Sequence, residues 1–344
     1  MSSAIRNWVS RRCLRPLTLS AARLTASGIR RYSLDEEART IFGERGFHLL
    51  RKHFYLPIPE AEDLGEEFWS RRSEMPGVDT GDEEALACLR ELFPAYLGEF
   101  RETFPLLHQS ADEPERFYLL NGSFMTIDAH VYYCLVRRHR PRRIVEIGAG
   151  NSTVVAAAAC ARNAAEGGPA ARLTAIDPFP LPVLKRGLPG VSELIEDKVQ
   201  NVPLELFTSL GEGDILFIDS THVLREGGDV QVEYCEILPR LAPGVLVHVH
   251  DISLPKAYPR VYFERHQLYW NEQYLLQAFL AFNSRFKVVW PGNYMMLNYP
   301  QDVCSVFPEY HAMREAFPSS EPASFWMRVA GGAGEPPRTS RFAE

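Results

Sequence analysis

The sequence has no long apolar run and few cysteines. No stretch approaches the roughly 18 to 20 apolar residues of a membrane-spanning helix, which argues against an integral membrane protein. The six cysteines are scattered, with no CxxC pair and no regular spacing, so the sequence favours neither a zinc knuckle nor a disulfide scaffold. This pattern is typical of a reducing compartment. We therefore expect a cytoplasmic protein of one large domain or two modest ones.

Acidic residues are absent from the first 34 positions, which hold seven arginines. The total charge of −7 therefore leaves −14 on the rest of the chain, and a body of that sign argues against a nucleic-acid partner. The basic leader 1–34 is predicted to be a disordered arm or a surface helix, which could touch an anionic membrane. A mitochondrial transit peptide is the alternative, since such peptides are rich in arginine and serine and poor in acids.

One short stretch carries the clearest local pattern. The apolar run 144–147 predicts a buried strand, the pair Gly148 and Gly150 predicts a tight turn, and Ser152 begins a predicted helix. Glycine lets the backbone approach a ligand, and the free N–H groups of the helix start point at that ligand. A dinucleotide fingerprint would have glycine at the position of Thr153. This departure favours S-adenosylmethionine over NAD as the ligand.

The sequence resembles the class I S-adenosylmethionine-dependent methyltransferases. The resemblance rests on Glu146-Ile-Gly-Ala-Gly150, on Asp177 after the next apolar run, and on the run from Asp214 to Asp219. Four longer stretches are similar to a mainly bacterial group that is usually identified only as methyltransferase-domain proteins: 53–59, 217–222, 247–252 and 271–279. The general resemblance covers roughly residues 121 to 300. It implies the fold and S-adenosyl-L-methionine as cofactor, but no particular acceptor.

Strand and helix patterns alternate regularly from residue 121 onward. Five apolar runs joined by helices predict a parallel sheet, and the runs 286–290 and 294–297, joined by Pro-Gly-Asn, predict a closing antiparallel hairpin. This arrangement resembles the seven-stranded methyltransferase sheet, an α/β Rossmann-like fold. We expect four segments: the leader 1–34, an N-terminal helical cap over 35–120, the methyltransferase domain over 121–300, and a C-terminal extension and tail over 301–344.

Polar residues follow the predicted strands, and ligands of an open parallel sheet bind beyond the carboxyl ends of its strands. Asp177 follows the strand 173–176, where its carboxylate could accept hydrogen bonds from two ribose hydroxyls. The resemblance implies that Glu146 orients the amino end of the cofactor. The predicted cofactor site consists of Glu146, Gly148, Ala149, Gly150, Ser152, Asp177 and Asp219.

Histidines stand near the ends of two further strands. His222 lies three residues after Asp219, where metal-dependent O-methyltransferases related to catechol methyltransferase carry a base. Imidazole suits that task because its ordinary pKa of about 6.5 is close to working pH. His250 and Asp251 end the next strand, whereas His248 lies deeper and is predicted to be a satisfied core histidine. The predicted catalytic residues are therefore His222, His250 and Asp251.

A divalent metal is an alternative reading of the same residues. Asp219, His222, His250 and Asp251 could together hold manganese, iron or zinc. The metal-dependent enzymes have an Asp-Asn pair after the fifth strand, and Ile252 stands here in place of the asparagine. Because an isoleucine cannot bind a metal, we favour a metal-free site with His222 or His250 as the general base.

Acceptor binding is predicted for His53 and Tyr55 of the cap and for Asn271 at the start of the last helix. Simple packing of the cap and a solvated helix start are the alternatives. The predicted function is methyl transfer to an oxygen or nitrogen of a small molecule, such as a sugar or a secondary metabolite. A catalytically inactive ligand-binding protein remains an alternative, and an NAD-linked oxidoreductase is disfavoured by Thr153 and by the terminal hairpin.

Overall fold

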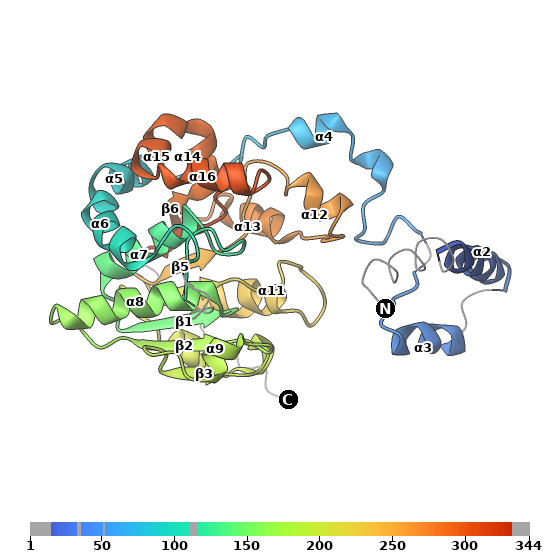
Figure 1. Ribbon diagram of the computed structural model, residues 1–344, viewed down its shortest axis with the longest axis horizontal. Helices are drawn as coiled ribbons and strands as arrows, with labels where there is room; N and C mark the ends of the chain where they lie inside the picture. The colour runs from blue at the N-terminus through green and yellow to red at the C-terminus, as the bar shows by residue number, and fades with distance from the viewer. Residues whose placement is uncertain (1–14, 33–35, 51, 110–115, 332–344) are drawn as a thin grey trace. The chain divides into compact units, whose positions relative to one another are not determined.

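The computed structural model describes residues 15–32, 36–50, 52–109 and 116–331. The chain divides into two compact units, residues 1–59 and 60–344. In the first unit, helix α2 spans Arg15–Tyr32 and helix α3 spans Glu36–Glu44 (Figure 1). Residues 15–32 of the predicted leader thus form a helix, and residues 1–14 lie outside the described part of the chain.

A seven-stranded sheet forms the centre of the second unit, with the strand order β3-β2-β1-β4-β5-β7-β6. The first five strands in sequence pair in parallel, and β7 pairs antiparallel with both β5 and β6. The α/β fold expected from the sequence is therefore confirmed, including its antiparallel end. The strands are β1 Arg143–Ile147, β2 Arg172–Ile176, β3 Glu193–Ile195, β4 Ile215–Ile218, β5 Leu246–Val249, β6 Phe286–Pro291 and β7 Phe325–Val329.

The prediction that residues 294–297 form the partner strand of β6 was wrong. Residues 294–297 lie in helix α14, which spans Gly292–Asn298, and β6 pairs instead with β7. Three consecutive helices, α14, α15 and α16, connect these two strands (Figure 1). The strand β7 thus comes from the segment that we expected to be a C-terminal extension, and it lies inside the sheet between β5 and β6.

Two apolar clusters cover the two faces of the sheet. Alternate residues of β1 point to opposite faces: Ile144 packs with residues of α6, α7 and α8, whereas Val145 and Ile147 pack with residues of α10, α11 and α13. The helices of this unit are α4 Glu66–Ser70, α5 Asp82–Ala87, α6 Pro94–Thr103, α7 Asp128–His139, α8 Asn151–Ala165, α9 Pro182–Lys185, α10 Leu204–Thr208, α11 Asp229–Val232, α12 Arg260–Glu264, α13 Glu272–Leu280, α14, α15 Pro300–Val306 and α16 Glu309–Ala316.

None of the helices in the described residues is long and apolar enough to cross a membrane.

Candidate functional site

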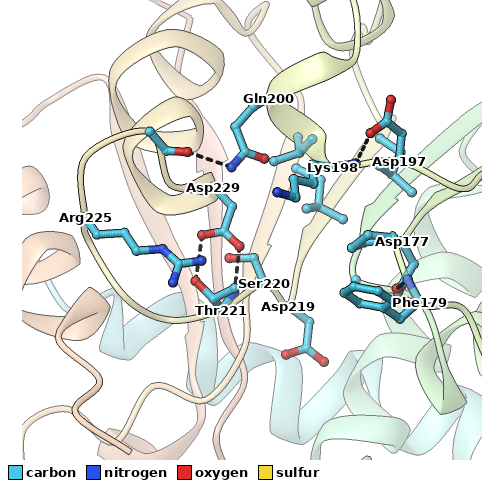
Figure 2. A pocket seen from close by; sticks show the side chains of 16 residues that line it. Asp177, Phe179, Asp197, Lys198, Gln200, Asp219, Ser220, Thr221, Arg225 and Asp229 are labelled. Carbon is cyan, nitrogen blue, oxygen red and sulfur yellow. Dashed lines mark hydrogen bonds between the residues drawn. The ribbon is translucent and has the colours of Figure 1, made fainter. Parts of the chain in front are cut away.

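A crevice opens beyond the carboxyl ends of the parallel strands. It contains a cavity of about 480 Å³ and a second cavity of about 370 Å³, and Gly148, Asp177 and Asp219 line both. Figure 2 shows the larger cavity, with Asp177 on one side, Asp229 on the other and Asp219 between them. The polar strand ends predicted from the sequence therefore meet in one place.

The turn between β1 and α8 forms the floor of this crevice. Gly148 has a φ of +81°, and a Cβ at this position would lie 1.8 Å from the carbonyl oxygen of Asp219. Only glycine fits there. At Gly150 an added Cβ would contact only Leu181, at 3.7 Å, and would project into the smaller cavity. The first glycine is required by the fold, and the second keeps space open for a ligand. Ala149 and the buried Ser152 line the same cavity.

Asp177 lies directly after β2, as the sequence predicted. Its Oδ2 accepts a hydrogen bond from the backbone N–H of Ala149 at 3.0 Å, and its Oδ1 accepts one from that of Phe179 at 2.6 Å. These two bonds fix the carboxylate at the junction of the two cavities. The remaining lone pairs are available to a ligand with hydroxyl donors.

The wall of the larger cavity includes residues that the sequence reasoning missed. Residues 197–200 follow β3 and line this cavity, where the Gln200 side chain donates a hydrogen bond to the Gly227 carbonyl oxygen at 2.9 Å (Figure 2). The Asp197 carboxylate accepts hydrogen bonds from the Lys198 backbone N–H and from the Asn201 side chain, both at 2.7 Å. The strand-end rule that located Asp177 does not single out Asp197, because the residue directly after β3 is Glu196.

Glu146 is fully buried on β1, beneath the glycine turn. The Tyr132 hydroxyl donates a hydrogen bond to its Oε1 at 3.0 Å, and its Oε2 has no partner among the described residues. Burial raises the pKa of Glu146 to about 7. A buried carboxyl oxygen without a partner is costly in the free protein, and it is suited to accept a hydrogen bond from an ammonium group.

The predicted catalytic residues His222 and Asp251 come together with Asp219. The His222 Nε2 lies 3.3 Å from Asp219 Oδ1 and 3.4 Å from Asp251 Oδ2, while its Nδ1 lies 2.9 Å from Glu272 Oε2. Burial alone would lower the pKa of His222, but its bonds to Asp219 and Glu272 hold that pKa well above the ordinary value. Three carboxylates thus surround the His222 ring, and its role as a general base stays a prediction.

His250 differs from His222 because it lines the smaller cavity. Its Nδ1 has no hydrogen-bond partner among the described residues. Burial alone would lower the pKa of His250, and the carboxylates of Asp219 and Asp251 reverse this, so the pKa lies above its ordinary value. His250 is the histidine of the cluster whose ring faces the crevice.

His248 lies in the core, as the sequence predicted, but it is not satisfied. Its ring stacks on Phe217 with centroids 4.0 Å apart and packs against Trp326 at 4.8 Å. Neither ring nitrogen has a partner in the described part of the chain. Burial lowers the pKa of His248 well below the ordinary value, so this ring is neutral and serves packing.

The three acceptor candidates belong to two different units of the chain. Asn271 precedes α13, where its Oδ1 accepts a hydrogen bond from the Leu224 backbone N–H at 2.6 Å. It lines neither of the two crevice cavities. His53 and Tyr55 belong to the first unit, where both are exposed and both rings contact Phe54. Their role in acceptor binding stays a prediction.

A candidate metal centre follows from three of the four predicted ligands. One ligand atom each from Asp219, His222 and Asp251 lies within 4.8 Å of the others. Two carboxylates and an imidazole suit zinc, iron or manganese. Ile252 is buried in the same apolar cluster as Val145 and Ile147. Its hydrocarbon side chain has no donor atom, so it contributes no fourth ligand. The donor set is chemically suitable and is limited to three side chains among the described residues.

Residues 145–252 match a family model described as a methyltransferase domain. This range runs from β1 through β5 and so includes most residues of the crevice. An uncharacterised protein of Archaeoglobus fulgidus is 33% identical over 175 residues, which cover 47% of this chain and 74% of that protein.

Solved structures with a similar chain course include two methyltransferases. Phosphoethanolamine N-methyltransferase 2 of Haemonchus contortus, in complex with S-adenosyl-L-methionine, is 12% identical with a TM-score of 0.32, over 59% of this chain and 52% of that one. The chain thus spans about half the length of that enzyme. An O-methyltransferase of Bacillus cereus in complex with SAH is 13% identical with a TM-score of 0.31, over 71% of this chain and 91% of that one.

Proposed function

We propose that the chain is a class I S-adenosylmethionine-dependent methyltransferase, whose crevice binds S-adenosyl-L-methionine and transfers the methyl group to an oxygen or nitrogen of a small molecule. The observation that carries the proposal is the position of the Asp177 carboxylate beside the Gly148 turn, at the junction of two cavities. Two cavities that share this carboxylate in their walls fit a nucleoside and an amino-acid moiety joined through one atom.

The residues of the crevice fit the parts of this cofactor. Asp177 would accept hydrogen bonds from the ribose hydroxyls, and the larger cavity, with Asp197 at its wall, would hold the base. The methionine part would lie along Gly150 in the smaller cavity, where no side chain fills the space. The partnerless Oε2 of Glu146 would accept a hydrogen bond from its ammonium group, directly or through water.

The chemistry then requires alignment and removal of one proton. The bound cofactor supplies a methyl group already activated on a positively charged sulfur. His250, whose ring faces the smaller cavity, accepts the proton of the acceptor hydroxyl or amine. His222 serves as a fixed cation that holds Asp219 and Asp251 on either side of its Nε2. The carboxylates in turn favour the protonated form of His250 that the reaction produces.

Calorimetry with S-adenosyl-L-methionine, S-adenosylhomocysteine and NAD tests this function. We expect both sulfur ligands to bind and NAD not to bind. Asp177→Ala should weaken cofactor binding by roughly 10- to 100-fold, because hydrogen bonds to a charged group contribute about 1.5 to 3 kcal/mol. Asp302→Ala, at an exposed position of α15, is the matched control. Binding of NAD alone would contradict the proposal.

The three-ligand cluster supports a second candidate, a metal-assisted methyltransferase. A divalent cation on Asp219, His222 and Asp251 would lower the pKa of a bound acceptor hydroxyl. Titration with Mn²⁺ in the presence of S-adenosylhomocysteine separates the two candidates. We expect no binding in the millimolar range, since only three protein ligands are available. Tight binding that Asp251→Asn abolishes would establish the metal-assisted mechanism instead.

A further inference from the structure

Glu272 is a buried carboxylate that the sequence analysis did not single out. It is the first residue of α13, and its side chain has no exposed surface. The Oε2 of Glu272 lies 2.9 Å from His222 Nδ1, and its Oε1 has no partner among the described residues. Burying a carboxylate costs several kcal/mol unless a partner compensates it. Among the described residues, the imidazole of His222 is the one basic side chain within 4.0 Å of this carboxylate.

The backbone of the same helix start also holds His222. The N–H groups of Asn271 and Glu272 both donate to the His222 carbonyl oxygen, at 3.0 Å and 3.2 Å. The Asn271 side chain accepts a hydrogen bond from the Leu224 N–H at 2.6 Å. His222 itself has a φ of 59°, which is uncommon for a residue other than glycine. This unusual backbone conformation is thus held by α13 from one side.

The ring of His222 is fixed in the same way. Trp270, two residues before Glu272, packs on the imidazole with ring centroids 4.4 Å apart. With Nδ1 engaged by Glu272, the other nitrogen can face only Asp219 and Asp251 at the crevice. A free imidazole could rotate about its bond to Cβ and exchange these contacts. The carboxylate of Glu272 removes that freedom.

A second buried carboxyl group lies close by but cannot replace Glu272. Glu233 accepts a hydrogen bond from the Ser220 hydroxyl at 3.1 Å. Burial and the charge of Glu272 raise the pKa of Glu233 well above the ordinary value. Glu233 bonds to Ser220, whereas the carboxylate that lies against His222 Nδ1 is that of Glu272.

We propose that Glu272 is a positioning residue of the methyl-transfer site, which holds the His222 ring with Nε2 between Asp219 and Asp251. The inference rests on the proposed function for its catalytic consequence, but the orientation of the ring can be tested without turnover. A carboxylate that accepts a hydrogen bond from one ring nitrogen of a histidine commonly fixes the orientation of the ring and the position of its proton.

The first test observes the ring directly in the full-length protein labelled with ¹⁵N-histidine. A ring N–H proton that exchanges slowly with water, and whose signal is lost in His222→Gln, reports the Nδ1 bond to Glu272. We expect Glu272→Ala to abolish this signal and Glu272→Gln to keep it at a shifted position, because the amide oxygen accepts the bond without a charge. Tyr274→Phe, on an exposed position of the same helix, should leave it unchanged. An unchanged signal in Glu272→Ala overturns the inference.

The second test measures the consequence for the reaction. Labelled S-adenosyl-L-methionine is incubated with each protein and one metabolite extract, and the initial rate of label transfer is compared. Glu272→Ala should bind the cofactor within twofold of the wild type and transfer label roughly tenfold or more slowly, because the bond that fixes the His222 ring is lost, whereas Glu272→Gln, which keeps that bond, should transfer label at a rate closer to that of the wild type. An unchanged rate overturns the positioning role. If the wild-type protein binds the cofactor but transfers no label, this result counts against the proposed function. The N–H signal tests the orientation of the His222 ring independently of that result.

Discussion

At the scale of single residues, the burial of the Glu146 carboxyl group costs stability. The carboxyl group is fully buried and one of its oxygens has no partner in the described residues. Its pKa is raised from 4.5 to about 7. The unfolded chain therefore loses this proton at lower pH than the folded chain does. As the pH rises from 4.5 to 7, ionisation increasingly favours the unfolded state, and above 7 the cost is constant.

Glu146→Gln should remove this pH-dependent cost. We expect the variant to unfold with a free energy close to that of the wild type at pH 4.5, and to be roughly 3 kcal/mol more stable than the wild type at pH 8, since one pKa unit corresponds to 1.36 kcal/mol. Urea denaturation at the two pH values measures the difference, with Glu102→Gln on an exposed position of α6 as control. The same stability difference at both pH values would show that Glu146 ionises normally.

The individual site residues differ in how far the sequence could predict them. Gly148 and Asp177 were predictable because a strand-end position and a local turn decide where they lie. The surroundings of His222 were not, since two of its three carboxylate neighbours, Asp251 and Glu272, come from later elements of the chain. Glu272 was also missed, because an amphipathic pattern cannot show that the first turn of a helix faces a loop 50 residues earlier in the chain.

At the scale of elements, local patterns predicted the parallel strands and their order of appearance. β1 and β4 have the predicted bounds, because both are short apolar runs between turn residues. The segment after β4 does not form one continuous helix but is divided into α11, a π-helical turn at Glu233–Ile237 and a short 3₁₀ turn at Leu238–Arg240. Such interruptions depend on packing, and no periodicity in the sequence marks them.

The last strand shows where local reasoning failed. The run 294–297 is apolar and follows Pro-Gly-Asn, so it matched a hairpin pattern, yet it forms a helix on the sheet. The true partner, β7, follows after three helices and pairs with β5 through Val249↔Phe325 and with β6 through Lys287↔Arg328. Pairing over such a distance is decided by burial of residues such as Trp326, which is completely covered, and a single sequence does not show it.

At the scale of the whole molecule, the chain separates into a unit of residues 1–59 and a unit of residues 60–344. All residues that line the two crevice cavities lie between positions 122 and 262, and the complete sheet lies between 143 and 329. The second unit thus contains every part that the proposed cofactor site needs. The first unit contains two of the residues predicted to bind the acceptor, His53 and Tyr55.

Because the proposed cofactor residues and the two predicted acceptor residues belong to different units, an experiment can test cofactor binding and acceptor binding separately. A chain that begins at Glu60 should bind S-adenosylhomocysteine with an affinity within about twofold of the full chain, because it keeps the core and the crevice intact.

If His53 and Tyr55 contact the acceptor, the full-length double variant His53→Ala/Tyr55→Ala should also keep this affinity but transfer label to the metabolite extract several-fold more slowly. Calorimetry and the transfer assay measure the two quantities on the same preparations. Loss of cofactor affinity in the shortened chain would show that the first unit supports the crevice itself, and an unchanged transfer rate in the double variant would remove His53 and Tyr55 from the acceptor site.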